Sequence, residues 1–312
     1  MALEHGQNAR QSRENRPISR VVAVINPMSG AGLDPSAATT RVRIVRDALG
    51  RAGLSPSIHL TERGGHAREL ATAAVRDRAD LLIVWGGDGT VNEAGSALVG
   101  SETALGLIPA GSGNGLAASL AVPFAPDAAL RHILSAAPRP VDVGMFAGRP
   151  FFNIAGIGLD AHIAELFNTR GRGRRGKWPY IVIGVREGWT YKARQYEVEL
   201  DGHRRSVAAI LLAFANGREY GMGACISPRA VLDDGLLEAT VVEDRPAPLR
   251  FLDARHLATR TIERARRVHT QQVRSSVITS DGPMQFHLDG EPGVIEGRVE
   301  IGLLPGALLV RA

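Results

Sequence analysis

Residues 85–120 read WGGDGTVNEAGSALVGSETALGLIPAGSGNGLAASL and contain two glycine clusters, GGDGT and GSGNG. Each cluster follows a short apolar run, DLLIVW or ALGLIP, and precedes a segment with helical spacing. Strands that are apolar on both faces and alternate with helices are typical of a covered parallel sheet. The stretch therefore predicts βαβ units, with a glycine-rich turn at the carboxyl end of two strands.

The same alternation runs from Val21 to about residue 140, whereas the sequence beyond Val141 has more numerous strand-like runs separated by turn residues. We predict an α/β nucleotide-binding domain with a parallel sheet over residues 18–140. A β-rich domain, a sandwich with helical insertions near residues 162–167, 180–191 and 249–266, is predicted over residues 141–312. Residues 1–17 are polar and charged and are expected to form a disordered leader. Whether the last residues pack back on the first domain is left open.

Composition narrows the class of protein. The 312 residues suffice for two domains of roughly 150 residues each. No run of about 18 apolar residues is present to span a bilayer, and the single cysteine, Cys225, excludes an internal disulfide. The net charge of +5 favours anionic partners, such as nucleotide phosphates, nucleic acid or acidic lipid. These features predict a cytoplasmic protein.

The glycine clusters predict a phosphate site. Glycine lets a phosphate approach the backbone N–H groups and the positive end of the following helix. Polar side chains stand among the glycines, and a third turn, NPMSGAG, follows the apolar run VVAVIN. Tight turns of an α/β sheet are the simpler alternative, but they need fewer glycines. Because ligands favour domain interfaces and the carboxyl ends of parallel strands, we expect a nucleotide between the two domains.

The motifs NPxSG, GGDGTxNE and GSGNG, in this order, resemble the catalytic domain of the diacylglycerol kinase family. FFNIAGIGLDA, NGREYGMG and HLDGEP continue the resemblance, which covers about residues 20–311. The family includes bacterial lipid kinases and the sphingosine and ceramide kinases. The resemblance implies an N-terminal domain similar to NAD kinases and phosphofructokinases, a C-terminal β-sandwich, and ATP and Mg²⁺ as cofactors. Many bacterial members carry GTxND in place of GSGNG, so the acceptor lipid is left open.

The resemblance also implies site residues. In the loop Pro228–Gly235, magnesium is implied at the side chain of Asp234 and the main-chain oxygens of Val231 and Leu236, an oxygen-only set that suits this ion. Together, the motifs and the three turns give the ATP contacts Asn26, Ser29, Gly30, Thr61, Gly86, Gly87, Asp88, Gly89, Thr90, Asn92, Glu93, Gly111, Ser112, Gly113 and Asn114.

Transfer of a phosphoryl group to an alcohol needs a carboxylate within hydrogen-bond reach of the acceptor. The resemblance to bacterial lipid kinases implies Glu291 as the proton acceptor, supported by Asp289, whereas the comparison with sphingosine kinases implies Asp88. We favour Glu291 as the base and assign Asp88 to the phosphates, and the choice is left open. A β-turn with Asp-Gly chemistry is the alternative for Asp289 and Glu291.

The segment GRGRRGKW, residues 171–178, matches GxGxxG but lacks a preceding buried strand and the Ser or Thr that would hold magnesium. Clustered cations beside tryptophan can bind anionic headgroups, so we expect membrane docking here, with a solvated loop as the alternative. The docking residues are Arg172, Arg174, Arg175, Lys177 and Trp178.

The sequence thus predicts an ATP-dependent lipid kinase that phosphorylates the hydroxyl of a diacylglycerol, sphingoid or ceramide type of membrane lipid, with a role in phospholipid synthesis. One alternative is an NAD kinase, which shares GGDGT, and another is a non-catalytic module that senses nucleotides and binds membranes. We expect a cytoplasmic protein in peripheral contact with anionic membranes and no nucleic-acid partner. The oligomeric state is left open, a homodimer included.

Overall fold

The structure is a computed structural model that describes residues 17–30, 36–170, 184, 186–221 and 223–312. The chain divides into two compact units. Unit 1 comprises Met1–Gly111, Leu120–Val141 and Gly306–Ala312, and unit 2 comprises Ser112–Ser119 and Asp142–Pro305. The GSGNG cluster is therefore divided, because its first glycine belongs to unit 1 and its other four residues to unit 2.

Unit 1 contains a parallel sheet with the strand order β2-β1-β3-β4. The C-terminal end of β15 (Arg298–Arg311) continues the sheet, with Val310 beside Leu105 in parallel register. All residues of β3 and β4 are buried, as expected for apolar strands covered on both faces. The strands are β1 (Val21–Ile25), β2 (Ser57–Leu60), β3 (Leu81–Gly86) and β4 (Ala104–Pro109).

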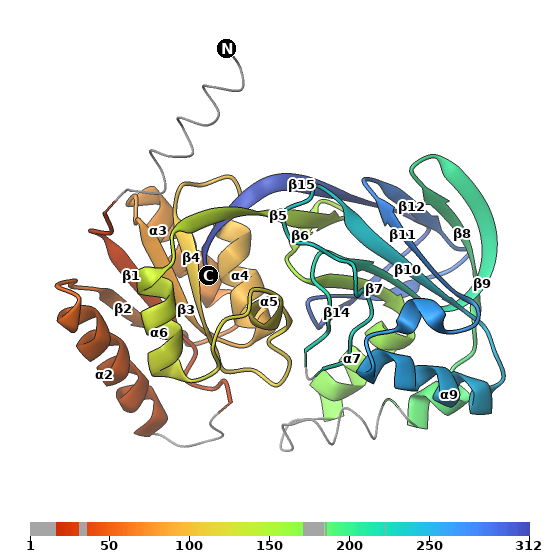
Figure 1. Ribbon diagram of the computed structural model, residues 1–312, viewed down its shortest axis with the longest axis horizontal. Coiled ribbons are helices and arrows are strands. Elements are labelled where there is room, and N and C mark those ends of the chain that lie inside the picture. The colour runs from red at the N-terminus through yellow and green to blue at the C-terminus, as the bar shows by residue number, and fades with distance from the viewer. Residues whose placement is uncertain (1–16, 31–35, 171–183, 185, 222) are drawn as a thin grey trace, which may run out of the picture. The chain divides into compact units, whose positions relative to one another are not determined.

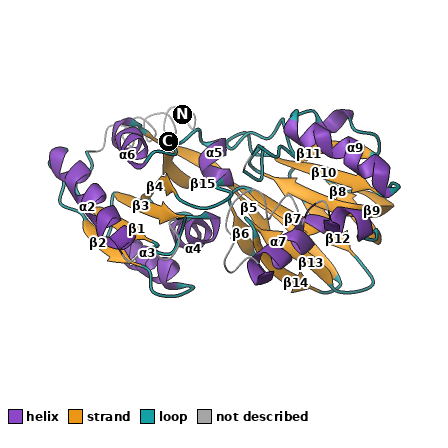
Figure 2. Cartoon of the chain, turned by 90° about the horizontal axis from the view of Figure 1, so that it is seen from below, coloured by secondary structure: helices purple, strands orange, loops and turns teal. Residues whose placement is uncertain are grey.

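Helices cover both faces of this sheet (Figures 1 and 2). Helices α2 (Ser36–Arg51) and α6 (Pro126–Ser135) lie on one face, and α3 (His66–Arg76) and α4 (Asp88–Leu98) lie on the other. Helix α3 buries three alanines that recur at helical spacing, so its packing face is small. Because the helices pack on both faces of the sheet, the turns that connect them to the strands lie at the edges of the sheet.

Unit 2 is a β-sandwich built from antiparallel pairs, with β14-β13-β7-β9-β8-β12-β15 as the main strand order. The first half of β9 pairs with β8, whereas its second half pairs with β7 on one side and β10 on the other. The strands are β5 (Pro138–Phe146), β6 (Arg149–Phe151), β7 (Ile154–Gly158), β8 (Arg194–Leu200), β9 (His203–Ala215), β10 (Leu237–Glu243), β11 (Val268–Val273), β12 (Ser276–Thr279), β13 (Met284–Leu288) and β14 (Glu291–Ile295).

Helix α7 (Leu159–Arg170) directly follows β7, and α9 (Ala247–Ala258) follows β10. The insertion predicted over residues 249–266 is divided into α9 and a short 3₁₀ helix, Ile262–Arg264. Arg260, with a φ of 57°, ends the α-helical path between them. Within the described part of the chain, no helix is both long and apolar enough to cross a bilayer.

Candidate active site

Three turns of unit 1 meet at the carboxyl edge of the parallel sheet. The N–H of Asn26, directly after β1, donates to the carbonyl of Trp85 at 2.9 Å, and the N–H of Thr61, directly after β2, donates to the carbonyl of Ile25 at 2.9 Å. The side chain of Asn26 reaches the GGDGT turn, because its Nδ2 donates to the hydroxyl of Thr90 at 2.9 Å. The NPMSG and GGDGT turns are therefore directly bonded to each other.

Close contact between turns explains two of the glycines. Gly30 has a φ of +72°, and a Cβ built there would lie 2.5 Å from the carbonyl oxygen of Ala110. A Cβ at Gly87 would lie 3.0 Å from the Cα of Gly111. Real Cβ atoms do not approach neighbours to 2.5 Å, so a larger residue at position 30 must displace the turn. These glycines let three turns share one small region of the sheet edge.

Helix α4 begins at Asp88, which is half-buried, and its N-cap residue is Gly87, which has no side chain to cap the first turn. The N–H groups at the start of a helix have no partner inside the helix and favour anions. A Cβ at Gly86 would lie 2.6 Å from the Cβ of Thr90, so Thr90 packs directly on the end of β3. The geometry of this turn, with Gly89 and Asn92 in the first turns of α4, suits a phosphate group.

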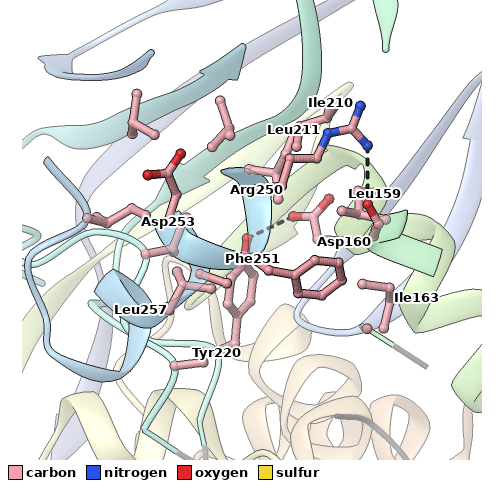
Figure 3. A pocket seen from close by; sticks show the side chains of 18 of the residues that line it. Leu159, Asp160, Ile163, Ile210, Leu211, Tyr220, Arg250, Phe251, Asp253 and Leu257 are labelled. Atoms are coloured by element: carbon pink, nitrogen blue, oxygen red, sulfur yellow. Dashed lines mark hydrogen bonds between the residues drawn. The ribbon is translucent and has the colours of Figure 1, made fainter. Parts of the chain in front are cut away.

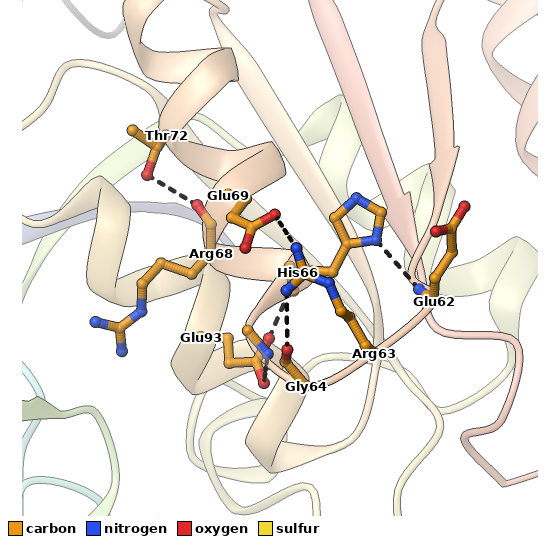
Figure 4. A network of polar contacts seen from close by, with 10 residues as sticks. Glu62, Arg63, Gly64, His66, Arg68, Glu69, Thr72 and Glu93 are labelled. Carbon is orange, nitrogen blue, oxygen red and sulfur yellow. Dashed lines mark hydrogen bonds and ion pairs between the residues drawn. The ribbon is translucent and has the colours of Figure 1, made fainter.

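Glu93 of the GGDGTxNE motif caps a neighbouring helix (Figure 4). Its carboxylate accepts the N–H of Gly65 at 2.8 Å and the N–H of Ala67 at 3.2 Å, at the start of α3. Arg63 lies in the same turn and forms an ion pair with Glu69 at 2.7 Å. A carboxylate at a helix N-terminus satisfies N–H groups and complements the helix dipole. Glu93 thus ties α4 to the turn that carries Thr61.

Arg41, on α2, is a residue that the motif analysis missed. Its Nη1 donates to the carbonyl of Asn26 at 2.5 Å and to the Oγ of Ser29 at 3.1 Å, and its Nη2 donates to the carbonyl of Ser29. The guanidinium also lies 5.4 Å from the centre of the Trp85 ring. Only 7% of Arg41 is exposed, and burial lowers its pKa. The helical spacing of Arg41 and Val45 on one buried face was the signal in the sequence.

The part of the GSGNG cluster in unit 2 packs against the turn after β9. A Cβ at Gly221 would lie 2.2 Å from the carbonyl oxygen of Gly113, and a Cβ at Gly115 would lie 2.1 Å from the Nδ2 of Asn153. Asn153 in turn donates to the carbonyl of Glu219 at 2.9 Å. The glycines of this segment therefore allow close packing within unit 2. The predicted ATP contacts found in this unit are Ser112, Gly113 and Asn114.

The hairpin turn between β13 and β14 carries two predicted catalytic carboxylates. Asp289 and Gly290 both have positive φ angles, as a two-residue hairpin turn requires. The carboxylate of Asp289 accepts three backbone N–H groups of residues 152–154, at 2.9, 2.8 and 3.1 Å. Asp289 thus anchors the turn, whereas Glu291, the first residue of β14, is exposed. Asp289 thereby holds the turn that precedes Glu291.

A buried polar network adjoins this hairpin. The Oδ2 of Asp160 accepts the hydroxyl of Tyr220 at 2.8 Å and lies 3.1 Å from the Nε2 of His287. The Nδ1 of His287 accepts the N–H of Gly290 at 3.2 Å, so the ring proton lies on Nε2 and is donated to Asp160. Asp160 and His287 are both buried. This network connects the start of α7 to the turn that carries Glu291.

An apolar cavity of about 540 Å³ lies in unit 2, between α7, α9, β9 and the residues Tyr220, Gly221, Gly223, Ala224 and Ile226. Figure 3 shows Ile163, Tyr220, Phe251 and Leu257 around the same space, with Asp160 bonded to Tyr220 at its wall. Small-molecule sites typically measure about 300–1,000 Å³ and combine apolar walls with a few polar groups. The sequence did not reveal this cavity, because its walls come from segments far apart in the chain.

The residues of the predicted magnesium site offer oxygen donors in a region of negative charge. The carboxylate of Asp234 accepts the N–H of Leu236 at 3.0 Å and the Nε2 of Gln272 at 3.2 Å. Burial, followed by the charge of nearby Asp142, raises the pKa of Asp234. One carboxylate with the main-chain oxygens of Val231 and Leu236 fits a hard divalent cation. No group of three or more His, Cys, Asp or Glu among the described residues could hold a metal ion.

The predicted membrane-docking residues lie outside the described part of the chain. They are Arg172, Arg174, Arg175, Lys177 and Trp178.

Comparison with known families covers both halves of the chain. Residues 20–146 match the diacylglycerol kinase catalytic domain, and residues 153–312 match the YegS C-terminal NAD kinase beta sandwich-like domain. The chain belongs to the diacylglycerol kinase family. Membership confirms the predicted family and fold class, an α/β domain with a parallel sheet followed by a β-sandwich.

This diacylglycerol kinase family member has named relatives in several bacteria. It is 34% identical to a "Probable lipid kinase YegS-like" of Chromohalobacter salexigens over 275 residues, 86% of this chain and 88% of the relative. It is 32% identical to a "Diacylglycerol kinase" of Mycobacterium tuberculosis over 234 residues, 72% of this chain and 74% of the relative. The fold of the family member also matches the crystal structure of a diacylglycerol kinase from Bacillus anthracis, with 22% identity, a TM-score of 0.70 and coverage of 95% of this chain and 97% of the other.

Proposed function

We infer that the protein transfers the γ-phosphate of ATP to a hydroxyl group of a membrane lipid whose hydrocarbon chain occupies the cavity of unit 2. Membership in a family of lipid kinases supports a kinase, and a kinase implies ATP as the phosphate donor. The apolar cavity carries the choice of a lipid acceptor, because its walls suit a hydrocarbon chain better than the charged phosphates of NAD. Asp160 and Tyr220 supply polar groups that orient the end of the acceptor.

On the donor side, the turns of unit 1 hold the phosphates. The start of α4 after Gly87 offers backbone N–H groups, and the bond from Asn26 to Thr90 connects the NPMSG and GGDGT turns. Asp88 lies at this helix start and is assigned to the phosphates. Asp234 and the main-chain oxygens of Val231 and Leu236 would hold a magnesium ion, which would supply positive charge for phosphoryl transfer.

On the acceptor side, Glu291 is assigned as the proton acceptor. Its carboxylate takes the proton of the lipid hydroxyl while the hydroxyl oxygen bonds to the γ-phosphorus and the bond to the β–γ bridging oxygen breaks, which leaves ADP. The three N–H bonds to Asp289 and the bond from Gly290 to His287 hold the hairpin turn. Such anchoring supports a base that must stay within hydrogen-bond reach of the acceptor.

The direct test is transfer of labelled γ-phosphate from ATP, with Mg²⁺, to diacylglycerol, monoacylglycerol, a sphingoid base, ceramide and phosphatidylglycerol in mixed micelles. We expect a labelled lipid from the wild type and none from Asp88→Ala. Ile163→Trp, which fills the cavity, is expected to raise the KM for the lipid without changing the KM for ATP. Val294→Trp, at an exposed position of β14, is the matched control.

Three outcomes contradict the proposed function or its lipid site. Phosphorylation of NAD in a parallel reaction, with no labelled lipid, identifies an NAD kinase. ATP binding without transfer to any acceptor identifies a nucleotide-sensing module. An unchanged KM for the lipid in Ile163→Trp, with transfer intact, removes the cavity from the acceptor site.

A further inference from the structure

Helix α9 presents apolar side chains on two opposite faces. Phe251 and Leu257 line the cavity, whereas Leu249 and Leu252, on the other face, are 37% and 55% exposed. No residue of α9 is fully buried. A surface helix normally buries one apolar face and turns a polar face to water. The outer face of α9 therefore has the composition of a surface that contacts an apolar partner.

Trp189 adds an exposed aromatic ring beside α9. Its ring stacks on Phe251, with ring centres 5.6 Å apart and planes at 28°, and the residue is 57% exposed. Phe251 lines both the cavity and a shallow hollow formed with Arg186, Trp189 and Thr190. The exposed aromatic surface is thus continuous with the wall of the proposed lipid cavity. Tryptophan, with an apolar body and a polar N–H, is enriched where water meets hydrocarbon.

Polar contacts hold α9 against the segment that carries Trp189. The guanidinium of Arg250 donates to the carbonyls of Gly188 at 3.2 Å and Tyr191 at 2.8 Å. It also forms an ion pair with Asp244 at 2.5 Å. These bonds fix the backbone on either side of Trp189 to the helix that carries Leu249 and Leu252. The same part of unit 2 therefore presents three exposed apolar side chains, Trp189, Leu249 and Leu252.

Exposed positive charges near these apolar side chains favour an anionic partner. Arg186 and Lys192 lie three residues before and after Trp189, and Arg255 lies three residues after Leu252 on the same helix; all three are exposed. Exposed apolar and aromatic side chains flanked by cations are typical of segments that lie in the interface of an anionic bilayer. The net charge of +5 acts in the same direction.

We propose that Trp189, Leu249 and Leu252 form a membrane-docking surface that enters the interfacial layer of a bilayer with anionic headgroups. The acceptor then moves from the bilayer into the cavity past Phe251 without exposing its hydrocarbon chain to water. This inference rests on the proposed lipid acceptor for the role of the cavity, but vesicle binding itself can be measured without catalysis.

The test is cosedimentation of the full chain with phosphatidylcholine vesicles, with and without phosphatidylglycerol. Leu249→Ser with Leu252→Ser is expected to lower the partition coefficient about tenfold, since two leucines no longer enter the apolar layer. Val294→Ser is the matched control, because this residue is 63% exposed on another element. Arg255→Gln is expected to weaken binding only to vesicles that contain phosphatidylglycerol.

A second measurement follows Trp189 directly. Its fluorescence, taken as the difference between the wild type and Trp189→Phe, is expected to shift to shorter wavelength when vesicles are added. Kinase activity toward a short-chain acceptor dissolved as monomers is expected to stay unchanged in Leu249→Ser with Leu252→Ser. Lost vesicle binding therefore supports the docking surface even where the phosphorylation assay fails.

Three results overturn the docking surface. The first is vesicle binding by the doubly substituted protein at the wild-type level. The second is an unshifted Trp189 emission on vesicles that bind the protein. The third is a change in oligomeric state, rather than in vesicle binding, on substitution of Leu249 and Leu252, which assigns the face to a second copy of the chain.

Discussion

Substitution of Gly30 by alanine tests whether the NPMSG turn must touch the turn after β4. The new Cβ would lie 2.5 Å from the carbonyl oxygen of Ala110, and the φ of +72° is unfavourable for alanine. The backbone conformation costs about 1–2 kcal/mol, and overpacking of a tight contact costs about 1–3 kcal/mol more. We expect Gly30→Ala to lower the free energy of unfolding by about 2–5 kcal/mol.

Gly53→Ala is the matched control. Gly53 has a φ of +74°, and a Cβ there would have no neighbour within 4 Å. This variant carries the cost of the backbone conformation alone, about 1–2 kcal/mol. The difference between the two variants therefore isolates the contact between the turns.

Thermal unfolding and ATP binding provide the assay. At roughly 2–4 °C for each kcal/mol, Gly30→Ala is expected to lower Tm by about 4–20 °C, and Gly53→Ala by about 2–8 °C. Calorimetric titration is expected to show weaker ATP binding for Gly30→Ala only, since the displaced turn carries Asn26 and Ser29. Equal Tm shifts with equal ATP affinity in the two variants would refute the reasoning.

Two further predictions address buried ionisable groups. Arg41→Met removes the guanidinium from the Asn26–Ser29 turn and is expected to cost about 3 kcal/mol of stability and to weaken ATP binding. Arg43 is exposed on the same helix, so Arg43→Met is expected to change neither stability nor ATP binding. Equal effects of the two substitutions would contradict the role of Arg41. Burial raises the pKa of Glu238, so the folded state holds this proton more tightly than the unfolded state, and the ionised carboxylate destabilises the fold at neutral pH. Glu238→Gln is expected to raise Tm at pH 7, and this gain is expected to shrink as the pH falls toward about 4.3, the ordinary pKa of glutamate. A gain in Tm that grows as the pH falls would contradict the destabilising effect of the ionised carboxylate.

The α/β architecture could be predicted because its signals are local. LLIVW and ALGLIP are apolar along their whole length, and they lie in β3 and β4, whose residues are all buried. The three polar turns could be placed at one edge because the strands are parallel, a consequence of topology alone. The contacts of Asn26 with Thr90 and of Gly30 with Ala110 needed the structure, since register and side-chain direction are not encoded in a motif.

The cavity and the polar network of unit 2 could not be predicted from the sequence. The cavity is lined by residues of α7, α9 and the segment from Gly223 to Ile226, whose proximity results from long-range strand pairing of β7, β9 and β10. The motif residue Asp160 was visible in the sequence, but its bonding partners lie far along the chain, Tyr220 at a separation of 60 residues and His287 at a separation of 127. A motif identifies such residues without giving their partners.

The division of the chain into units has a consequence for its evolution and its handling. The path leaves unit 1 after Gly111 and after Val141, and returns to it at Leu120 and at Gly306. A single cut cannot separate the two units, because removal of everything before Asp142 also removes the segment that carries Gly113 and Gly115. Unit 2 would then lose the backbone that packs on Gly221 and Asn153. Exchange of one half with a related protein by a single crossover would therefore replace half of a packed contact, so the two halves are expected to be inherited together.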